Sequence, residues 1–525
     1  MNRQKSFLKS EKFFFILFII MAAVGIFIYL PSCYDKIITY DSSYQYGLTR
    51  QSWSEIWRLL PEDYSPPLYT VILKISCMIF GHTLKVMRFT NSIVIFGLVF
   101  LALFPIRRGF GAKTGIVAAV CFICSTVNMQ LFSEIRPTYL AYFFVTGTAV
   151  YAYLAFFGGK RKDYICHAVF SLLAMYTHNI GMIIILGIYV TVLLFSLIQK
   201  DKKKFFRFFI SGAVCAVLYL PWLVVVLKQF ENVKKNYWKG IPSTFSSLIA
   251  YCIKSILHIN SFSSSSLFAV FIDETLSILI KLLIIFFILK NLGLKKIKKV
   301  SDLKNAPLFS KENRALYFKG LFVLMLFLVP LIIFEVLTRT VYPLSTQRYY
   351  FMFTGIVILI IVSVMNRIEG KIIPFVLSAL LIANTVLIHY RAYDLYSLST
   401  ADKIIETIER DDPDGKICFI HSHEWTLGVM SYYYPEAKHF VFDDTWTVLN
   451  DMSVFGIELE HISVPEAIAE YTDHFYIFCP YFSEESDLQE YFEDSPDFEC
   501  QKVKGFWNYF STPKYIKLIR VDVKK

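Results

Sequence analysis

Eleven apolar stretches divide the first 390 residues of this chain, and they restrict its fold more than any other feature. They cover residues 13–31, 85–106, 114–132, 138–158, 164–179, 181–198, 207–227, 267–289, 319–337, 350–366 and 372–390. A helix of about 20 apolar residues crosses the ~30 Å hydrocarbon core of a bilayer. With 55% hydrophobic residues overall, the sequence predicts an α-helical polytopic membrane protein with about 11 transmembrane helices.

Lys and Arg gather between alternate apolar stretches, which indicates the orientation of the chain. The clusters lie in residues 3–12, 107–113, 160–162, 200–207, 290–319 and 367–371. All of them fall on one side if the apolar stretch 67–80, about 14 residues or ~21 Å of helix, does not span. Because basic loops stay on the cytoplasmic side, we expect a multi-pass protein of the cell membrane with a cytoplasmic N-terminus.

The net charge of +11 does not indicate nucleic-acid binding, because its distribution follows the expected topology. Residues 400–525 carry 11 Lys and Arg against 25 Asp and Glu, a net of −14, which leaves +25 for the remainder. That positive charge lies mostly in the predicted cytoplasmic loops, where it attracts anionic lipids. We therefore expect membrane lipids as partners and no nucleic acid.

The chain divides into a transmembrane domain, residues 1–392, and an acidic domain, residues 393–525. The second part alternates expected helices with expected strands, which favours a small α/β domain on the extracytoplasmic side. Helices are expected at 400–410, 424–433, 464–471 and 484–494. Strands are expected at 416–420, 438–442, 474–479, 498–504 and 514–521.

Two carboxylates stand in the outer loop after the first apolar stretch. Asp41 follows that stretch by about ten residues, and Asp63 stands in Glu62-Asp63-Tyr64 ahead of Pro66-Pro67. Carboxylates held at a membrane surface suggest chemistry on a lipid-borne substrate. We take both as candidate catalytic residues.

Further ionisable residues map to the same outer end, where such groups usually face a cavity or a partner. Glu134 and Arg136 form either a local salt bridge or a pair that lines a polar cavity. His178 is either a structural residue of a hairpin tip or part of a site. Arg348 is either an interfacial anchor or a phosphate-binding group, for which its planar guanidinium is well shaped. No metal-binding motif is present, and we expect no cofactor; use of a divalent cation stays open.

These residues, taken in order, carry a resemblance to a known family. The order is an anchor, the loop with Asp41, Pro66-Pro67-Leu68-Tyr69, an Arg136-x-x-Tyr139 that opens an apolar stretch, Tyr176-Thr177-His178, and Arg348-Tyr349. It resembles the GT-C glycosyltransferases of the protein-mannosyltransferase and aminoarabinose-transferase type (glycosyltransferase family 39-like). The resemblance covers roughly residues 10–390.

The resemblance implies a reaction and a set of roles. A sugar would arrive on a polyprenyl phosphate at the outer face, and the hydroxyl of a cell-envelope glycan, lipid or protein would attack its anomeric carbon with inversion. Asp41 would act as the base or orient the acceptor, and Asp63 would be a second acid. Glu134, Arg136, Tyr139, His178 and Arg348 would line the cavity or hold the phosphate.

Two positions differ from the pattern of many relatives. Ser42 follows Asp41 where those relatives carry Glu, and Ser65 precedes the proline pair where they carry His. Two other functions therefore stay open from the sequence. One is a transporter or flippase of lipid-linked sugars, which would favour an internal repeat and broken helices. The other is a non-catalytic envelope glycan assembly protein.

Overall fold

The protein is described by a computed structural model that covers most of the transmembrane domain and much of the C-terminal part. The described residues are 11–34, 38–62, 64–236, 311–343, 347–365, most of 375–386, 400–412, 417–421, 424–442, 452–457, 459–462, 465–479, 490–508 and 514–524. The predicted span 267–289, the boundary at 392/393 and Asp63 lie outside them.

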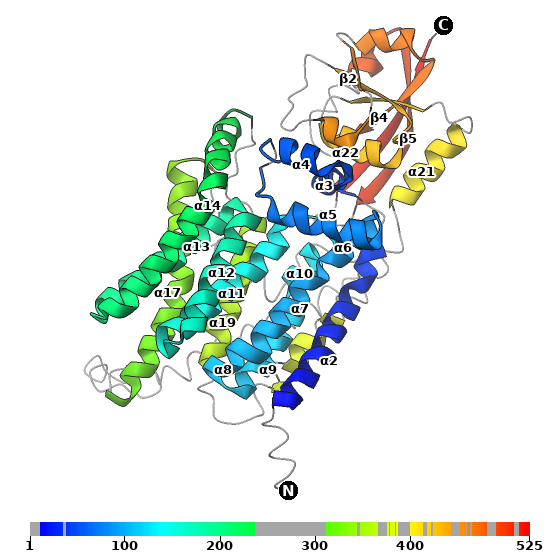
Figure 1. Cartoon of the computed structure of the whole chain (residues 1–525). Coiled ribbons are helices and arrows are strands. Elements are labelled where there is room, and N and C mark those ends of the chain that lie inside the picture. The colour runs from blue at the N-terminus through cyan, green and yellow to red at the C-terminus, as the bar shows by residue number, and fades with distance from the viewer. Residues whose placement is uncertain are drawn as a thin grey trace, which may run out of the picture.

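A bundle of long helices forms the membrane part (Figure 1). Its members are α2 (Glu11–Tyr29), α7 (Ser92–Leu101), α9 (Ala112–Ile123), α11 (Pro137–Gly158), α12 (Arg161–Thr177), α13 (Asn179–Ile198), α14 (Lys202–Asn236), α17 (Lys311–Thr340) and α19 (Thr354–Met365). Within the described residues, six helical segments are long and apolar enough to cross a membrane. The polytopic helical fold expected from the sequence is confirmed.

The other predicted spans coincide with shorter helices or with partly described segments. The span predicted at 164–179 corresponds to α12, which has 17 residues. The span at 350–366 begins with the short helices α18 (Gln347–Tyr350) and η6 (Phe351–Phe353) and continues into α19. The span at 372–390 is helical where it is described.

One predicted span, 114–132, is not a single helix. It divides into α9 and α10 (Thr126–Leu131) around Cys124 and Ser125. The side-chain amide of Asn128 donates hydrogen bonds to the carbonyl oxygens of Phe122 at 2.5 Å and Ile123 at 3.1 Å. Because these carbonyls at the end of α9 are satisfied by a side chain, the helix can stop inside the bundle.

Short helices cover the end of the bundle that faces the C-terminal part (Figure 1). They are α3 (Tyr40–Arg50), α4 (Trp53–Leu59), α5 (Leu68–Phe80) and α6 (Leu84–Thr90). The apolar stretch 67–80 forms α5, which lies across this end and has 13 residues. Pro67 precedes α5, and Gly81, with a φ of 95° that favours glycine, follows it.

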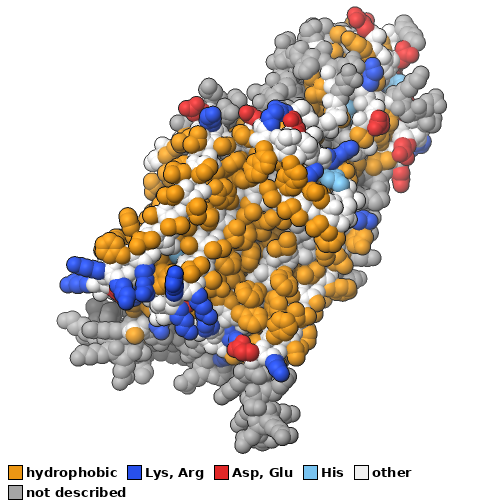
Figure 2. Space-filling model, viewed as in Figure 1, with side chains coloured by type: hydrophobic (Ala, Val, Ile, Leu, Met, Phe, Trp, Pro, Cys, Tyr) orange, Lys and Arg blue, Asp and Glu red, His pale blue; other side chains and the backbone are white. Residues whose placement is uncertain are grey.

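The surface of the bundle has two distinct regions (Figure 2). Exposed apolar side chains such as Phe206, Phe209 and Val217 of α14 cover its sides, as expected of helices that face lipid. Lys and Arg side chains gather at the end away from the C-terminal part. This separation follows the charge pattern of the sequence.

The C-terminal part contains a six-stranded sheet with strand order β3-β2-β1-β4-β6-β5. Its strands are β1 (Cys418–His421), β2 (Lys438–Phe442), β3 (Leu459–Ile462), β4 (His474–Cys479), β5 (Phe498–Asn508) and β6 (Lys514–Val523). Strands β1 to β4 are parallel, while β6 runs antiparallel to β4 and β5. The helices α21 (Thr400–Asp411) and α22 (Glu424–Tyr433) confirm the α/β pattern. Strand β3 was not predicted, because its four residues include Glu460 and His461 and lack an alternating pattern.

Candidate active site at the C-terminal-domain end of the bundle

Asp41 lies in the first turn of α3, at the covered end of the bundle. Thr39 caps this helix, since its hydroxyl accepts a hydrogen bond from the amide of Ser42 at 3.4 Å. A carboxylate near a helix N-terminus is stabilised by the free amide groups there. The side chain of Asp41 is 41% exposed, so it is fixed by the helix yet open to a substrate.

Two arginines from distant parts of the chain converge on Asp41. Arg136, just before α11, forms an ion pair with its carboxylate. The guanidinium of Arg348, in α18, lies 3.5 Å from the same carboxylate oxygen. Glu134 lies 3.5 Å from Arg136. We call Asp41, Glu134, Arg136 and Arg348 the Asp41 cluster; it joins three segments of the chain and contains two negative and two positive charges.

Buried polar side chains hold the loop that carries Glu134 and Arg136. Tyr69 donates a hydrogen bond to Asn91 at 3.2 Å, and the amide of Asn91 donates to the carbonyl oxygens of Phe132 at 2.8 Å and Glu134 at 2.9 Å. Tyr69 is the tyrosine of the Pro-Pro-Leu-Tyr motif, and Asn91 stands within an apolar stretch. A polar residue in such a stretch was the signal that sequence reasoning missed.

Two more contacts fix the same loop. The guanidinium of Arg88 is buried and donates to the carbonyl oxygen of Ser133 at 2.9 Å. The backbone amide of Ile135 donates to the hydroxyl of Ser42 at 3.4 Å. Because Ser42 follows Asp41 directly, this bond ties the loop to the start of α3.

Partial burial shifts the pKa of Glu134. Loss of water raises the pKa of its carboxyl above the ordinary value; Arg136 and Arg348 lower it again, and the nearby Asp41 raises it. Two carboxylates that share cations resist simultaneous ionisation. Glu134 therefore accepts a proton more readily than an exposed glutamate would.

His178 borders the cluster at the turn between α12 and α13. Its Nδ1 accepts a hydrogen bond from the amide of Ile180 at 3.1 Å, so it caps α13. Burial, together with the charge of Arg348, lowers the pKa of His178 to about 3. The ring is therefore neutral at neutral pH, with its proton on Nε2. It packs edge-on against Tyr349, with ring centroids 5.5 Å apart.

The hydroxyl of Tyr139 has a partner outside the Asp41 cluster. Its side chain is fully buried in the first turns of α11, and its hydroxyl donates to the side-chain oxygen of Asn128 at 3.0 Å. The structure thus brings together Asp41, Glu134, Arg136 and Arg348 of the predicted residues, with His178 at the edge. The roles assigned to all of them stay predictions.

The C-terminal domain contacts the helix that carries Asp41. The hydroxyl of Tyr433 in α22 accepts a hydrogen bond from the amide of Ile38 at 3.2 Å. The ring of Phe455 packs against Tyr40 and Tyr44, with centroid distances of 6.3 Å to each. The sequence predicted this domain but not its contact with α3.

Within the described parts of the chain, no group of three or more His, Cys, Asp or Glu side chains is arranged to hold a metal ion. Two cavities, of about 580 and 560 Å³, lie elsewhere in the bundle, and residues of the Asp41 cluster line neither of them.

Comparisons with known proteins agree with the resemblance read from the sequence. Residues 64–225 match the family model described as dolichyl-phosphate-mannose-protein mannosyltransferase. This match includes Arg136 and His178, and it ends before α17. No curated protein matches the sequence.

Two solved structures share the fold over almost the whole chain. One is ArnT from Cupriavidus metallidurans bound to undecaprenyl phosphate, with a TM-score of 0.56, 10% identity, and coverage of 97% of this chain and 98% of the other. The same protein in the apo state gives a TM-score of 0.54 at 10% identity, covering 96% and 97%. The GT-C-like fold is thereby confirmed, and it extends through the C-terminal domain.

Proposed function

We propose that this protein is a membrane glycosyltransferase that moves a sugar from a polyprenyl-phosphate donor to a hydroxyl of a cell-envelope acceptor. One observation carries the proposal: Asp41 lies between Arg136 and Arg348 at one end of a GT-C-like bundle. The cluster supplies a carboxylate for a proton and guanidinium groups for a phosphate. The donor class is supported by the shared fold with a protein bound to undecaprenyl phosphate.

The two arginines suit the phosphate of the donor. Guanidinium groups bind phosphate oxygens through charge-assisted hydrogen bonds. Arg348 is 28% exposed and Arg136 is 19% exposed, so a headgroup entering from the membrane surface can reach both. Binding of the phosphate would compete with Asp41 for the arginines and leave the carboxylate available to the acceptor.

The chemical step is then a single inverting displacement. The acceptor oxygen forms a bond to the anomeric carbon, and the bond between that carbon and the phosphate oxygen breaks. The proton of the acceptor passes to Asp41, while the electron pair of the broken bond passes to the phosphate. Arg136 and Arg348 stabilise the charge that develops on the leaving group.

We place this chemistry on the extracytoplasmic face of the cell membrane. The basic side chains gather at the opposite end of the bundle (Figure 2), and such an end favours the cytoplasm. The C-terminal domain would then lie outside, above the acceptor.

The proposal is tested with purified protein and a radiolabelled polyprenyl-phosphate sugar. Asp41→Asn is expected to lower kcat by about 10²- to 10⁴-fold, the usual contribution of a general base, with an unchanged melting temperature. Glu55→Gln is the matched control, because Glu55 is a carboxylate of the same end whose partner is the surface residue Arg58. Retained turnover in Asp41→Asn would remove Asp41 from this role. Label that crosses liposomes without transfer would favour a flippase.

A further inference from the structure

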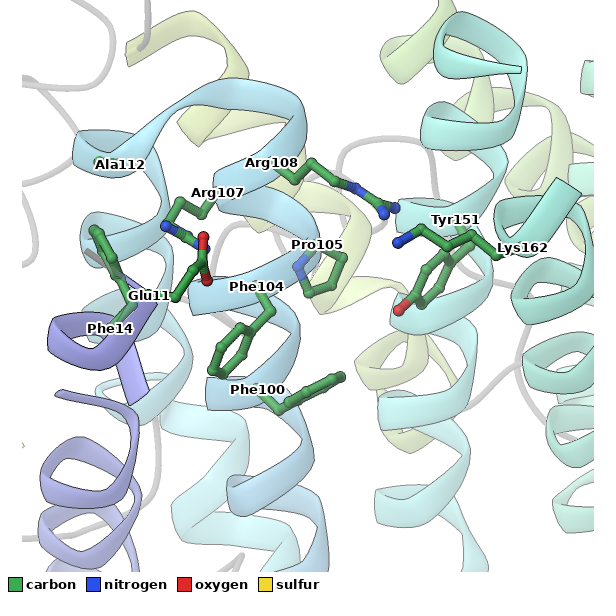
Figure 3. A pocket seen from close by; sticks show the side chains of 10 residues that line it. All are labelled: Glu11, Phe14, Phe100, Phe104, Pro105, Arg107, Arg108, Ala112, Tyr151 and Lys162. Atoms are coloured by element: carbon green, nitrogen blue, oxygen red, sulfur yellow. The ribbon is translucent and has the colours of Figure 1, made fainter. Parts of the chain in front are cut away.

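The larger of the two cavities noted above lies at the opposite end of the bundle from Asp41 (Figure 1). It has a volume of about 580 Å³ and is lined by residues of α2, α7, the π-helical turn Ala102–Ile106, α8 (Arg107–Phe110), α9, α11 and α12. Figure 3 shows its lining: Arg107, Arg108 and Lys162 supply basic groups, while Phe100 and Phe104 supply an apolar wall. The Asp41 cluster has no part in it.

The basic groups come from different helices and meet at the cavity. Arg108, from α8, and Lys162, from α12, extend toward each other from opposite sides (Figure 3). Two cations that face each other repel unless an anion lies between them. Such an arrangement is characteristic of an anion site.

The carboxylates present do not neutralise all of this charge. Glu11 pairs with Arg107, whose Nη2 lies 2.6 and 2.7 Å from its two oxygens. The buried Asp163 pairs with Arg108. Within the described residues, no ion pair joins Lys162 to a carboxylate, and Nε of Arg107 has no hydrogen-bond partner. The cavity therefore keeps one uncompensated positive charge, that of Lys162.

The apolar wall indicates that the anion belongs to a lipid. Phe100 is 38% exposed on the side of the bundle, next to Phe104 at a ring distance of 5.1 Å. A soluble anion gains nothing from these rings, whereas an acyl chain buries apolar surface against them. Basic pockets between helices at the cytoplasmic end of a membrane protein suit anionic headgroups.

We propose that this cavity binds the phosphodiester of an anionic glycerophospholipid, with an acyl chain on Phe100 and Phe104. A phosphodiester carries one negative charge, which balances the cavity. The lipid would contact both α8 and α12 and so stabilise the packing of these two helices. This site is independent of the proposed transfer reaction.

The test titrates full-length protein, in neutral detergent, with short-chain phosphatidylglycerol, phosphatidylcholine or inorganic phosphate. A ligand that binds the folded state raises the melting temperature. We expect phosphatidylglycerol to act at a concentration at least about fivefold below that of phosphatidylcholine, because one basic contact near a membrane surface contributes about that factor. Inorganic phosphate is expected to have no effect.

Variants identify the binding groups. Lys162→Gln is expected to raise the half-saturating concentration of phosphatidylglycerol about fivefold. Lys160→Gln removes another exposed positive charge two residues away that does not line the cavity, and this variant is expected to bind the lipid as wild type does. Arg108→Lys keeps the pair with Asp163 and therefore the fold, and it is also expected to weaken binding.

Three results would overturn the proposal. The first is equal binding of phosphatidylglycerol and phosphatidylcholine. The second is wild-type binding by both Lys162→Gln and Arg108→Lys. The third is stabilisation by inorganic phosphate equal to that by the lipid, which would assign the cavity to a soluble anion.

Discussion

Gly47 of α3 lies directly against the backbone carbonyl of Val454 in the C-terminal domain. A Cβ added at Gly47 would stand 2.5 Å from that carbonyl oxygen. The side-chain amide of Gln51 donates to the same oxygen at 3.2 Å. The C-terminal domain thus contacts the helix whose first turn carries Asp41, so this contact links the position of the domain to the position of the carboxylate.

Gly47→Ala tests this link, because an open helix and a tight contact predict changes in stability of opposite sign. In an open helix, Gly→Ala raises stability by roughly 0.5–1 kcal/mol. Here the new methyl group meets backbone, which cannot rotate away, and overpacking typically costs about 1–3 kcal/mol. We therefore expect a lower melting temperature and a lower kcat, measured by thermal unfolding in detergent and by sugar transfer.

Gly158→Ala is the control for that substitution. Gly158 ends α11, and a Cβ there would meet its nearest neighbouring atom only at 3.9 Å. This variant is expected to keep wild-type turnover. A melting temperature for Gly47→Ala at or above that of wild type would contradict the tight contact with Val454.

Arg348→Lys is expected to weaken donor binding. Lysine keeps the charge but cannot present two parallel N–H donors to a phosphate. We expect KM for the donor to rise about tenfold, the equivalent of one charge-assisted hydrogen bond of ~1.4 kcal/mol, with a smaller change in kcat. Steady-state kinetics with varied donor separates the two constants.

Arg339→Lys is the control, because Arg339 lies near the end of α17, only nine residues before Arg348. The variant loses a guanidinium group outside the Asp41 cluster. Arg339 pairs with Glu335 one turn earlier at 3.4 Å and is 49% exposed, and such surface pairs contribute little. An unchanged KM in Arg348→Lys would remove Arg348 from the phosphate site.

The sequence could predict that the site residues lie at the same end of the bundle, but it could not predict which of them form ion pairs. Asp41, Arg136 and Arg348 each stand where an apolar stretch ends on the predicted outer side, and the alternation of spans brings such positions to one end of a bundle. Which arginine meets Asp41 depends on how the helices pack, and no local pattern encodes that.

The features that sequence reasoning missed depend on contacts between distant segments. The break at Cys124 follows from the side chain of Asn128, and the docking of Val454 on Gly47 joins residues more than 400 positions apart. The Arg136-x-x-Tyr139 motif located the start of α11 correctly. The rotation of that helix, which turns Tyr139 toward Asn128, is set by packing.

Tyr69→Phe is expected to lower turnover although Tyr69 itself has no proposed contact with the substrate. It removes the hydrogen bond to Asn91, which holds the carbonyl of Glu134, and costs about 1 kcal/mol of stability. A looser loop would misplace Arg136, so we expect kcat to fall severalfold. Tyr176→Phe is the control, because its hydroxyl bonds to the carbonyl of Leu218 at 2.7 Å. Equal turnover in the two variants would argue against positioning by Tyr69.

A cysteine at Ser54 tests the orientation of the chain. Ser54 is exposed on α4, at the same end as Asp41. We expect Ser54→Cys to react with a membrane-impermeant thiol reagent added to intact cells. Lys160→Cys, exposed at the opposite end, is expected to react only after permeabilisation. The reverse pattern would invert the topology and move Asp41 to the cytoplasmic face.

His178 predicts a pH dependence of stability. Its pKa in the folded protein is lowered to about 3 from an ordinary value of 6.5. Between these two pH values the unfolded chain therefore binds a proton at this residue that the folded protein does not bind. The stability contributed by the neutral ring is fully present above pH ~6.5 and is lost as the pH falls from there toward 3. The melting temperature of wild type should therefore fall on acidification.

His178→Asn separates this titration from the structural role of the residue. Asparagine is a good helix cap, so it can replace Nδ1 as the acceptor of the Ile180 amide while carrying no titratable group. Compared with wild type, we expect the proton uptake linked to unfolding to be lower by roughly a quarter of a proton at pH 7 and by nearly one proton at pH 5, measured from the pH dependence of stability. His82, His421 and His439, whose pKa values are also lowered, titrate equally in both proteins. A variant whose stability falls with pH as steeply as that of wild type would place the responsible proton elsewhere.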